Sequence, residues 1–354
     1  MLKVQTERLF KYHKVMILVL IIMIAASRLV ADRVMKSESV SPYKSDAVSE
    51  RFDELLEQSE GMTLEECAQF IETRQLSSLK GGAEQDEITA VMLYRSELQK
   101  CFEVRGYRNY CLYGKGIVSI DIPKDINTNN EKYAGFAVPK VVNSDAFMKY
   151  LYLSSFSLIP VIILLLTAVL RADSYEKGVE RQIMLSAERA GFHRVREWIM
   201  ISVITLVCAA EQLSLLIMSG TLGRNEYSSA PLQSVTGFTT SAFRGTITQF
   251  IVFIIARQLL SAVLCYQVFA ILAQKLCSVK RYILAAFGIT ALMSLASYYI
   301  PELSPYMFAS IGKTENMAYS LDYISIIDGS EAPLVIILMS SVICGLIIWR
   351  REEN

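Results

Sequence analysis

Long apolar runs, separated by polar and charged segments, dominate the chain. A helix needs about 20 apolar residues to cross the roughly 30 Å hydrocarbon core of a bilayer. Six runs meet this requirement: about 15–31, 152–170, 198–218, 247–273, 283–300 and 333–349. The pattern therefore predicts an α-helical polytopic membrane protein with six transmembrane helices.

The charges that flank these runs predict an orientation. The segments on one side of the predicted spans hold fifteen Lys and Arg residues: 1–14, 171–197, 275–281 and the C-terminal tail. The short segments on the other side, 221–246 and 301–332, hold three. Because cytoplasmic segments carry the excess of positive charge, we expect both termini in the cytoplasm of a multi-pass plasma-membrane protein.

The N-terminal run has two interpretations. A basic start followed by an apolar core is also typical of a cleaved signal peptide. No A-x-A cleavage site follows, however, and Arg28 stands where such a peptide would be small and neutral. We therefore expect residues 1–31 to form a cytoplasmic N-terminus and a retained first span, with Arg28 reaching toward the outer interface.

Residues 32–150, between the first two spans, are polar enough to fold in water. Three segments have apolar residues at helical spacing: 46–58, 64–79 and 86–104. Two later segments, rich in β-branched and other apolar residues, predict strands: 117–122 and 136–142. We expect a mixed α/β extracytoplasmic domain here, followed by a five-helix transmembrane domain over 151–354.

Three of the seven cysteines, Cys67, Cys101 and Cys111, fall in this outer domain. An extracytoplasmic compartment is oxidising, so three cysteines predict one disulfide and one free thiol. Three different pairs could form the disulfide. We expect the disulfide to be a structural staple and not a redox centre.

Composition narrows the chemistry. The chain is 53% hydrophobic, and 35 Lys+Arg balance 35 Asp+Glu, so no basic field exists to bind nucleic acid. The two histidines, His13 and His193, lie outside the apolar runs, which disfavours a metal site or a Ser-His-Asp triad. No G-x-x-x-x-G-K-[ST], H-E-x-x-H, C-x-x-C or G-x-S-x-G motif occurs. We expect this chain to hold no cofactor and not to be an enzyme.

The segment 172–197 between the second and third spans has the strongest local pattern. Four apolar residues fall on one helical face: Val179, Ile183, Ala187 and Ala190. Charged residues, among them Arg181, cover the other side, which predicts an amphipathic helix over about 174–191, ended by Gly191. Such a helix is either a solvated interfacial helix or a docking helix for a cytoplasmic partner.

This segment also resembles a known motif. An E-x-G-x5–8-L-S-x2–4-R pattern is present in five residues: Glu176, Gly178, Leu185, Ser186 and Arg189. It is similar to the coupling region of permeases of the ABC-2 exporter class, although Ala187-Glu188 replaces the usual Thr-Pro. The layout of the whole chain is similar as well, with a large outer domain after the first span and an outer segment, 301–332, between the last two.

The resemblance implies a division of labour. A separate ATP-binding cassette subunit would bind ATP and Mg²⁺, dock on 172–197 and drive export. The permease would act with a second copy of itself or with a paralogue, and the missing phosphate loop agrees with this arrangement.

Two alternatives remain. The segment 189–194 faintly resembles the R-A-x-G-x-S-x-x-Q signature of lipoprotein-release and cell-division permeases, which usually have four spans. A membrane sensor whose outer domain binds a ligand would need no nucleotide-binding partner.

Besides Arg28, two charges lie within the predicted spans, where ionisable residues are rare. Glu211 and Arg257 stand about nine and ten residues from the outer ends of adjacent spans. Equal depth in neighbouring helices predicts that they form an intramembrane pair. Such a pair would fix helix register or line a polar pathway, whereas unpaired side chains would reach toward water.

Overall fold

The computed structural model describes most of the chain. The described residues are 25, 28, 29, 33, 46–81, 84–113, 139–154, 157–179, 189–235, 238, 243, 245–300, 303, 306–308 and 332–353. Contacts divide the chain into two compact units, which we name and describe separately. The polar unit is Met35–Leu151 with Leu216–Phe253, and the membrane unit is Met1–Val34, Tyr152–Leu215 and Ile254–Asn354.

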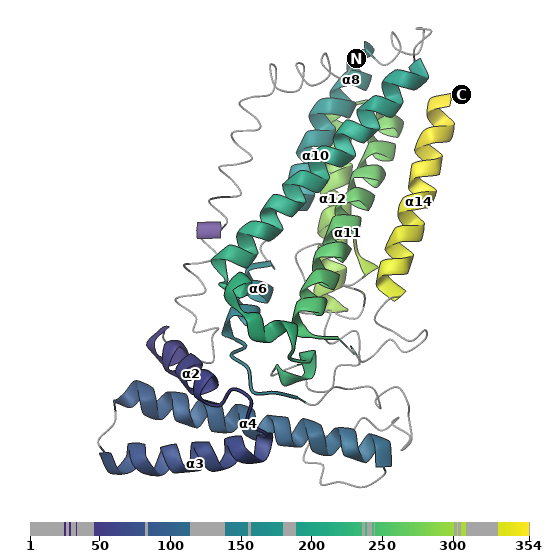
Figure 1. Cartoon of the computed structure of the whole chain (residues 1–354). Coiled ribbons are helices and arrows are strands. Elements are labelled where there is room, and N and C mark those ends of the chain that lie inside the picture. The colour runs from purple at the N-terminus through teal and green to yellow at the C-terminus, as the bar shows by residue number, and fades with distance from the viewer. Residues whose placement is uncertain are drawn as a thin grey trace. The chain divides into compact units, whose positions relative to one another are not determined.

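Three helices build most of the polar unit: α2 (Asp46–Gln58), α3 (Leu64–Gly81) and α4 (Gln85–Tyr113). α3 and α4 form a helical hairpin, and α2 packs on α4 (Figure 1). α3 begins with a capping box, in which Thr63 and Glu66 each bind the backbone N–H of the other at 3.3 and 2.7 Å. Phe52, Ile71 and Tyr94 lie in the apolar core shared by the three helices.

The polar unit also contains short helices near the ends of the spans: α6 (Asp145–Ser154), η2 (Thr221–Gly223), η3 (Asn225–Ser228) and η4 (Leu232–Ser234). Gly220, with φ +75°, ends α10 in the left-handed conformation that glycine adopts without strain. Four phenylalanines pack together beside these turns, with ring centroids 5.1–6.3 Å apart: Phe147, Phe238, Phe243 and Phe250.

The predicted mixed α/β domain is wrong for the described residues, which form helices and no strand. Of the second predicted strand, 139–142 has no regular structure. The first, 117–122, lies outside the described residues. α4 extends to Tyr113, nine residues beyond the predicted end of the third helix at 104, and its residues from Ala90 to Phe102 pack against α2 and α3.

Four helical segments are long and apolar enough to cross a membrane: Asp145–Glu176, Val195–Met218, Ile247–Leu276 and Val279–Tyr299. They confirm the second to fifth predicted spans. The sixth falls in α14 (Ala332–Glu353), whose apolar stretch is the shorter Val335–Ile348. Only three residues of the first are described, and the count of six stays a prediction.

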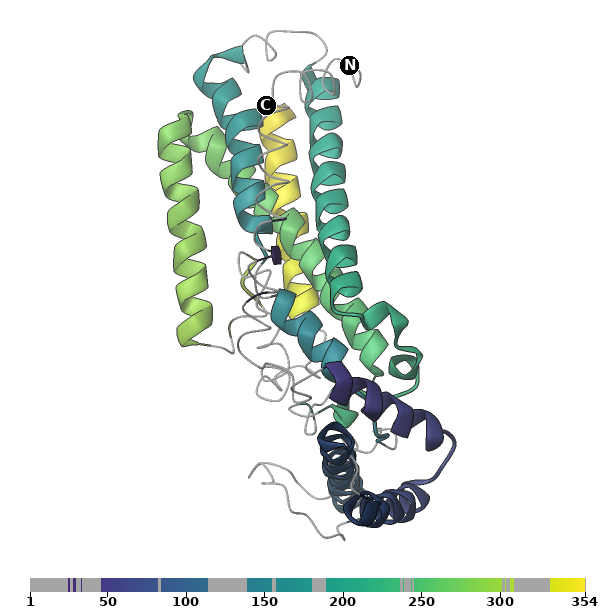
Figure 2. The same ribbon diagram turned by 90° about the vertical axis from the view of Figure 1, so that its left-hand side faces the viewer.

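The helical elements of the membrane unit include α7 (Ile159–Thr167), η1 (Ala168–Ala172), α8 (Asp173–Glu176), α10 (Arg189–Met218), α11 (Ile247–Leu276), α12 (Val279–Tyr299) and α14. Their axes are roughly parallel, and the chain direction alternates between α10, α11 and α12 (Figures 1 and 2). The shared core includes Ile163, Phe269 and Tyr282, whose hydroxyl donates to the carbonyl of Leu164 at 3.1 Å. α12 lies at the edge of this unit (Figure 2), and only 17% of its apolar window is buried.

Candidate functional site

Arg28, in the first predicted span, pairs with Glu211 of α10 inside the membrane unit. Both are buried, with 5% of each residue exposed, and Nη2 of Arg28 bonds to Oε1 of Glu211. Nη1 of Arg28 also donates to the backbone carbonyl of Leu153 at 2.8 Å. Oε2 of Glu211 accepts a hydrogen bond from the Ser157 hydroxyl at 3.1 Å. Both charges therefore have further hydrogen bonds, which a buried ion pair needs to offset its desolvation.

The two charges bind backbone groups on either side of Ser157, in the non-helical residues 157–158 of the second apolar segment. α6 and α7 are separate helices within the one apolar segment Asp145–Glu176. Leu153 in the last turn of α6 offers the carbonyl that Arg28 binds, and Leu158, directly before α7, offers an N–H to Glu211. A helix carries partial negative charge at its C-terminal end and partial positive charge at its N-terminal end. Arg28 thus lies at the partly negative C-terminal end of α6, and Glu211 lies at the partly positive N-terminal end of α7. Each side chain binds a backbone group that has no partner within its own helix.

The predicted pair of Glu211 with Arg257 is not present. Arg257 lies on α11, fully buried, with Nη2 3.5 Å from the carbonyl oxygen of Met307. Equal depth does not bring two residues together, because depth leaves open the direction of each side chain around its helix axis. The expectation that Arg28 reaches the outer interface is wrong for the related reason that a carboxylate and a carbonyl meet it inside the unit.

A second buried cluster joins the two ends of the segment that links α8 to α10. Arg171 is fully buried on the π-helical stretch Ala168–Ala172 and pairs with Glu197 near the start of α10. Glu197 also accepts a hydrogen bond from the Tyr266 hydroxyl of α11 at 2.9 Å, and Arg196 Nε lies 3.8 Å away. The Arg171 guanidinium is 5.8 Å from the Tyr266 ring centroid, within cation–π range.

The sequence reasoning counted Arg171 and Arg196 only as charges that set the orientation and did not consider Glu197. A signal was available, because Arg171 and Glu197 are opposite charges at the facing ends of two consecutive apolar runs. The π-helical turn that points Arg171 inward leaves no mark that we can identify in the sequence. Such turns are frequent at functional sites.

Two residues of the resembling motif have defined local roles. Oε2 of Glu176 accepts the backbone N–H of Val279 at 2.9 Å, and so satisfies a donor at the start of α12. Gly178 has φ +70°, which a residue with a side chain rarely adopts, and it ends the helix that leaves the second span. The predicted helix over 174–191 is therefore interrupted at this turn, and Gly191 lies inside α10 and does not end a helix.

Arg181, Leu185 and Ser186 lie outside the described residues, and Arg189 is the first residue of α10 without a described side chain. The structure thus brings Glu176 against α12 and places no other motif side chain.

The predicted disulfide is not formed at either described cysteine. Cys67 and Cys101 are buried free thiols, and the side chain of Cys111 lies outside the described residues. Burial and the nearby charge of Glu97 raise the pKa of the Cys101 thiol to about 12. Cys67 packs among the apolar residues of the three-helix core, and Cys101 is buried with 2% exposed, so both act as small hydrophobic groups.

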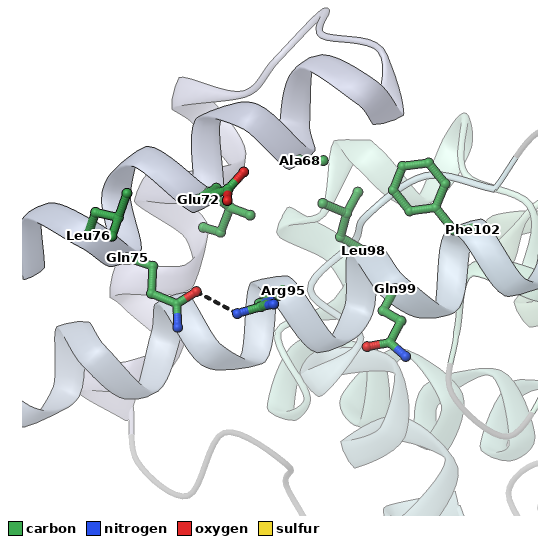
Figure 3. A pocket seen from close by; sticks show the side chains of 9 residues that line it. Ala68, Glu72, Gln75, Leu76, Arg95, Leu98, Gln99 and Phe102 are labelled. Atoms are coloured by element: carbon green, nitrogen blue, oxygen red, sulfur yellow. Dashed lines mark hydrogen bonds between the residues drawn. The ribbon is translucent and has the colours of Figure 1, made fainter. Parts of the chain in front are cut away.

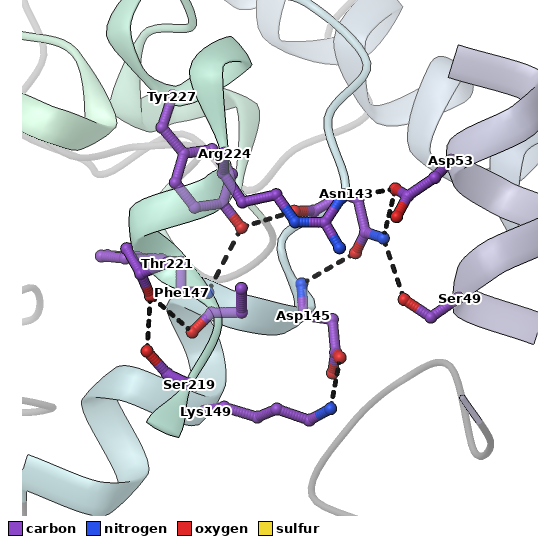
Figure 4. A network of polar contacts seen from close by, with 11 residues as sticks. Ser49, Asp53, Asn143, Asp145, Phe147, Lys149, Ser219, Thr221, Arg224 and Tyr227 are labelled. Atoms are coloured by element: carbon purple, nitrogen blue, oxygen red, sulfur yellow. Dashed lines mark hydrogen bonds and ion pairs between the residues drawn. The ribbon is translucent and has the colours of Figure 1, made fainter. Parts of the chain in front are cut away.

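A polar network holds α2 to the later segments of the polar unit (Figure 4). The Asn143 amide, fully buried, donates to Ser49 at 3.0 Å and to Asp53 at 2.7 Å. Arg224 donates to the same Asp53 oxygen at 2.6 Å. Burial alone lowers the pKa of Arg224, but the hydrogen bond and the charge of Asp53 outweigh it and raise the pKa. Tyr227 donates to the Asn143 carbonyl at 2.5 Å, and burial raises the pKa of its phenol.

An open groove of about 490 Å³ lies along α3 and α4 (Figure 3). Ile71, Leu98 and Phe102 supply apolar surface, and Gln75 and Arg95 face each other across it with a 2.7 Å hydrogen bond. Four of its nine lining residues carry a charge or an amide, so the groove suits a ligand of mixed polarity.

No group of three or more His, Cys, Asp or Glu side chains suited to a metal ion occurs in the part of the chain that the structure describes. No protein family, curated protein or solved structure matches this chain.

Proposed function

We propose that this chain is the membrane-spanning permease subunit of an ABC transporter of the ABC-2 exporter class. One observation carries the proposal. The ends of the segment that resembles a coupling region are fastened to the spans by the cluster of Arg171, Glu197 and Tyr266. Glu176 adds a hydrogen bond to the first residue of α12.

These contacts provide a route for mechanical coupling. Arg171 lies on the second span and Glu197 on α10, whereas Tyr266 belongs to α11. Force applied to 177–195 reaches all three helices through this one cluster. Its ion pair and hydrogen bond lie largely inside the unit, so replacing either partner by water would cost free energy. A loop fastened only by exposed contacts would move without its helices.

The proposal includes the finer topology. Six spans place both termini in the cytoplasm of the plasma membrane, and the segment 172–197 faces the same side. A separate ATP-binding cassette subunit binds ATP and Mg²⁺ and docks on this segment. A second permease copy or a paralogue completes the translocation path.

Charge reversal on the docking segment tests the proposal. The chain is purified with its nucleotide-binding partner, and ATP hydrolysis is measured in the assembled complex. Arg181→Glu with Arg189→Glu should abolish partner binding and stimulated hydrolysis, while the permease still inserts.

The matched control is Arg350→Glu with Arg351→Glu, which makes the same change of charge on the proposed cytoplasmic side but off the segment. This control should retain stimulation. Unchanged hydrolysis in the Arg181 and Arg189 double variant, or absence of any nucleotide-binding subunit from the native complex, would exclude the proposal.

The groove on α3 and α4 favours one other candidate function, a membrane sensor whose polar unit binds a ligand. The same purification distinguishes the sensor from the permease by whether an ATPase subunit copurifies with the chain. A sensor is complete without an ATPase, whereas a permease of this class is inactive without one.

A further inference from the structure

The connection between α11 and α12 presents three exposed cations. Lys275 stands at the end of α11, and Lys280 and Arg281 stand in the first turn of α12. None of the three forms an ion pair with a described carboxylate. Only two residues, Cys277 and Ser278, separate the helices, so the cations are confined to one short turn.

The acidic residues of neighbouring α8 offset only part of this charge. Asp173 is bound to Lys177 at 2.8 Å. Glu176 accepts the backbone N–H of Val279 at 2.9 Å and so brings one negative charge to the turn. Among the described side chains, three cations therefore face one carboxylate, and an excess of positive charge remains.

An exposed apolar face begins directly beside the cations. Lys280, Leu284 and Phe287 follow one another at i, i+4 and i+7 and so share a face of α12. Leu284 is 76% exposed and Phe287 is 65% exposed. The opposite face, with Tyr282 and Ala286, is buried in the membrane unit.

We propose that this surface binds an anionic phospholipid, with its headgroup on Lys275, Lys280 and Arg281 and its acyl chains along Leu284 and Phe287. The cations match the headgroup charge, and the apolar row starts one helical turn away, where acyl chains begin. An acidic protein surface would fit the cations but would leave this apolar row without a partner. The inference needs only membrane insertion and holds whether or not the chain is a permease.

The charges set the size of the effect. Each Lys or Arg near an anionic membrane surface contributes about 1 kcal/mol, which is about a fivefold change in binding. We therefore expect a preference of at least about fivefold for anionic over zwitterionic lipid at this site at low salt. Raising the salt to about 1 M shortens the screening length to about 3 Å and should remove most of the preference.

Quenching by brominated lipids measures this preference. Trp198 and Trp349 are replaced by Phe, and Leu284→Trp reports from the proposed site. The full chain is reconstituted in vesicles that contain brominated phosphatidylglycerol or brominated phosphatidylcholine. The phosphatidylglycerol preference should appear in this variant, fall with salt, and drop to about one when Lys275, Lys280 and Arg281 are all changed to Gln.

The control reporter is Leu338→Trp on α14, which is also exposed and apolar but far along its helix from the nearest cation. It should show no preference between the two lipids. Equal quenching by both lipids at Leu284→Trp, or the same preference at both reporters, would overturn the inference. Absence of quenching at Leu284→Trp by either lipid would also overturn it, because a protein surface would then cover this face.

Discussion

Exchanging the charges of Arg28 and Glu211 tests whether these residues serve only each other or also the nearby ends of α6 and α7. In a simple ion pair, Arg28→Glu with Glu211→Arg restores the attraction. In this structure the exchange places an anion against the Leu153 carbonyl and a cation against the Leu158 N–H and the start of α7. Each helix end then meets a charge of its own sign.

The expected losses of folding free energy distinguish the single variants, the neutral double variant and the exchanged double variant. Removing one partner of a buried pair costs about 3–5 kcal/mol of folding free energy, so Arg28→Met or Glu211→Gln alone should be strongly destabilising. The neutral double variant leaves no orphan charge, and we expect it to recover most of the loss. A charge at a partly buried helix end contributes up to about 2 kcal/mol. The exchanged variant should therefore be less stable than the neutral double variant by about 2–4 kcal/mol, from two helix ends.

Denaturant-induced unfolding in mixed micelles gives the four free energies of a double-mutant cycle. Arg33→Glu, at an exposed position in the same N-terminal segment, controls for the change in charge and should have little effect. Full recovery in the exchanged variant would refute the role of the helix ends. Additive losses in the two single variants would refute the contact itself.

Three further predictions concern the thiols, the turn and the polar network. Cys101 should resist alkylation at pH 8 in the folded chain, because its raised pKa of about 12 leaves little thiolate at pH 8. Exposed Cys277 should react readily, and peptide mass spectrometry compares the two sites. Gly178→Ala should destabilise the turn by about 1 kcal/mol because it forces an alanine to a positive φ, and thermal unfolding measures the loss. Asn143→Leu should lower the stability of the polar unit by about 2–3 kcal/mol, since it removes two donated hydrogen bonds from a buried amide, whereas Asp53→Asn, which keeps an acceptor, should cost less in the same assay.

Sequence patterns located the elements better than their contacts. Four spans and the first two helices of the polar unit follow from apolar periodicity, which burial in lipid or in a core imposes along the chain. The start of α7 leaves no mark in the apolar periodicity, because both halves of the segment are apolar, and Pro160 at the first turn of α7 is its only local signal. The nearby backbone groups of Leu153 and Leu158 are bound by side chains from distant segments. Depth in the membrane did not identify the partner of Glu211. That partner, Arg28, lies in the N-terminal run, which the sequence also allows to be a cleaved signal peptide.

The second predicted strand, 136–142, failed for a different reason, whereas the first, 117–122, lies outside the described residues and stays a prediction. Apolar β-branched residues after Gly114 favour strands locally, and no long-range information in one sequence states whether a partner strand exists. In the described part of that region, residues 139–142 have no regular structure. The Arg171 cluster was missed because basic residues at span ends fit a topological rule so well that a specific acidic partner was not sought.

The two-residue connection between α11 and α12 has a consequence for biogenesis. With so short a connection, α12 begins within a few ångströms of the end of α11. α11 therefore cannot insert fully into the bilayer while α12 remains far from it. We therefore expect the two helices to insert as one hairpin, with Lys275, Lys280 and Arg281 at its tip. Lengthening this turn would uncouple the two insertion steps, and α12, which buries so little of itself against the protein, would then depend on its own hydrophobicity to stay in the membrane.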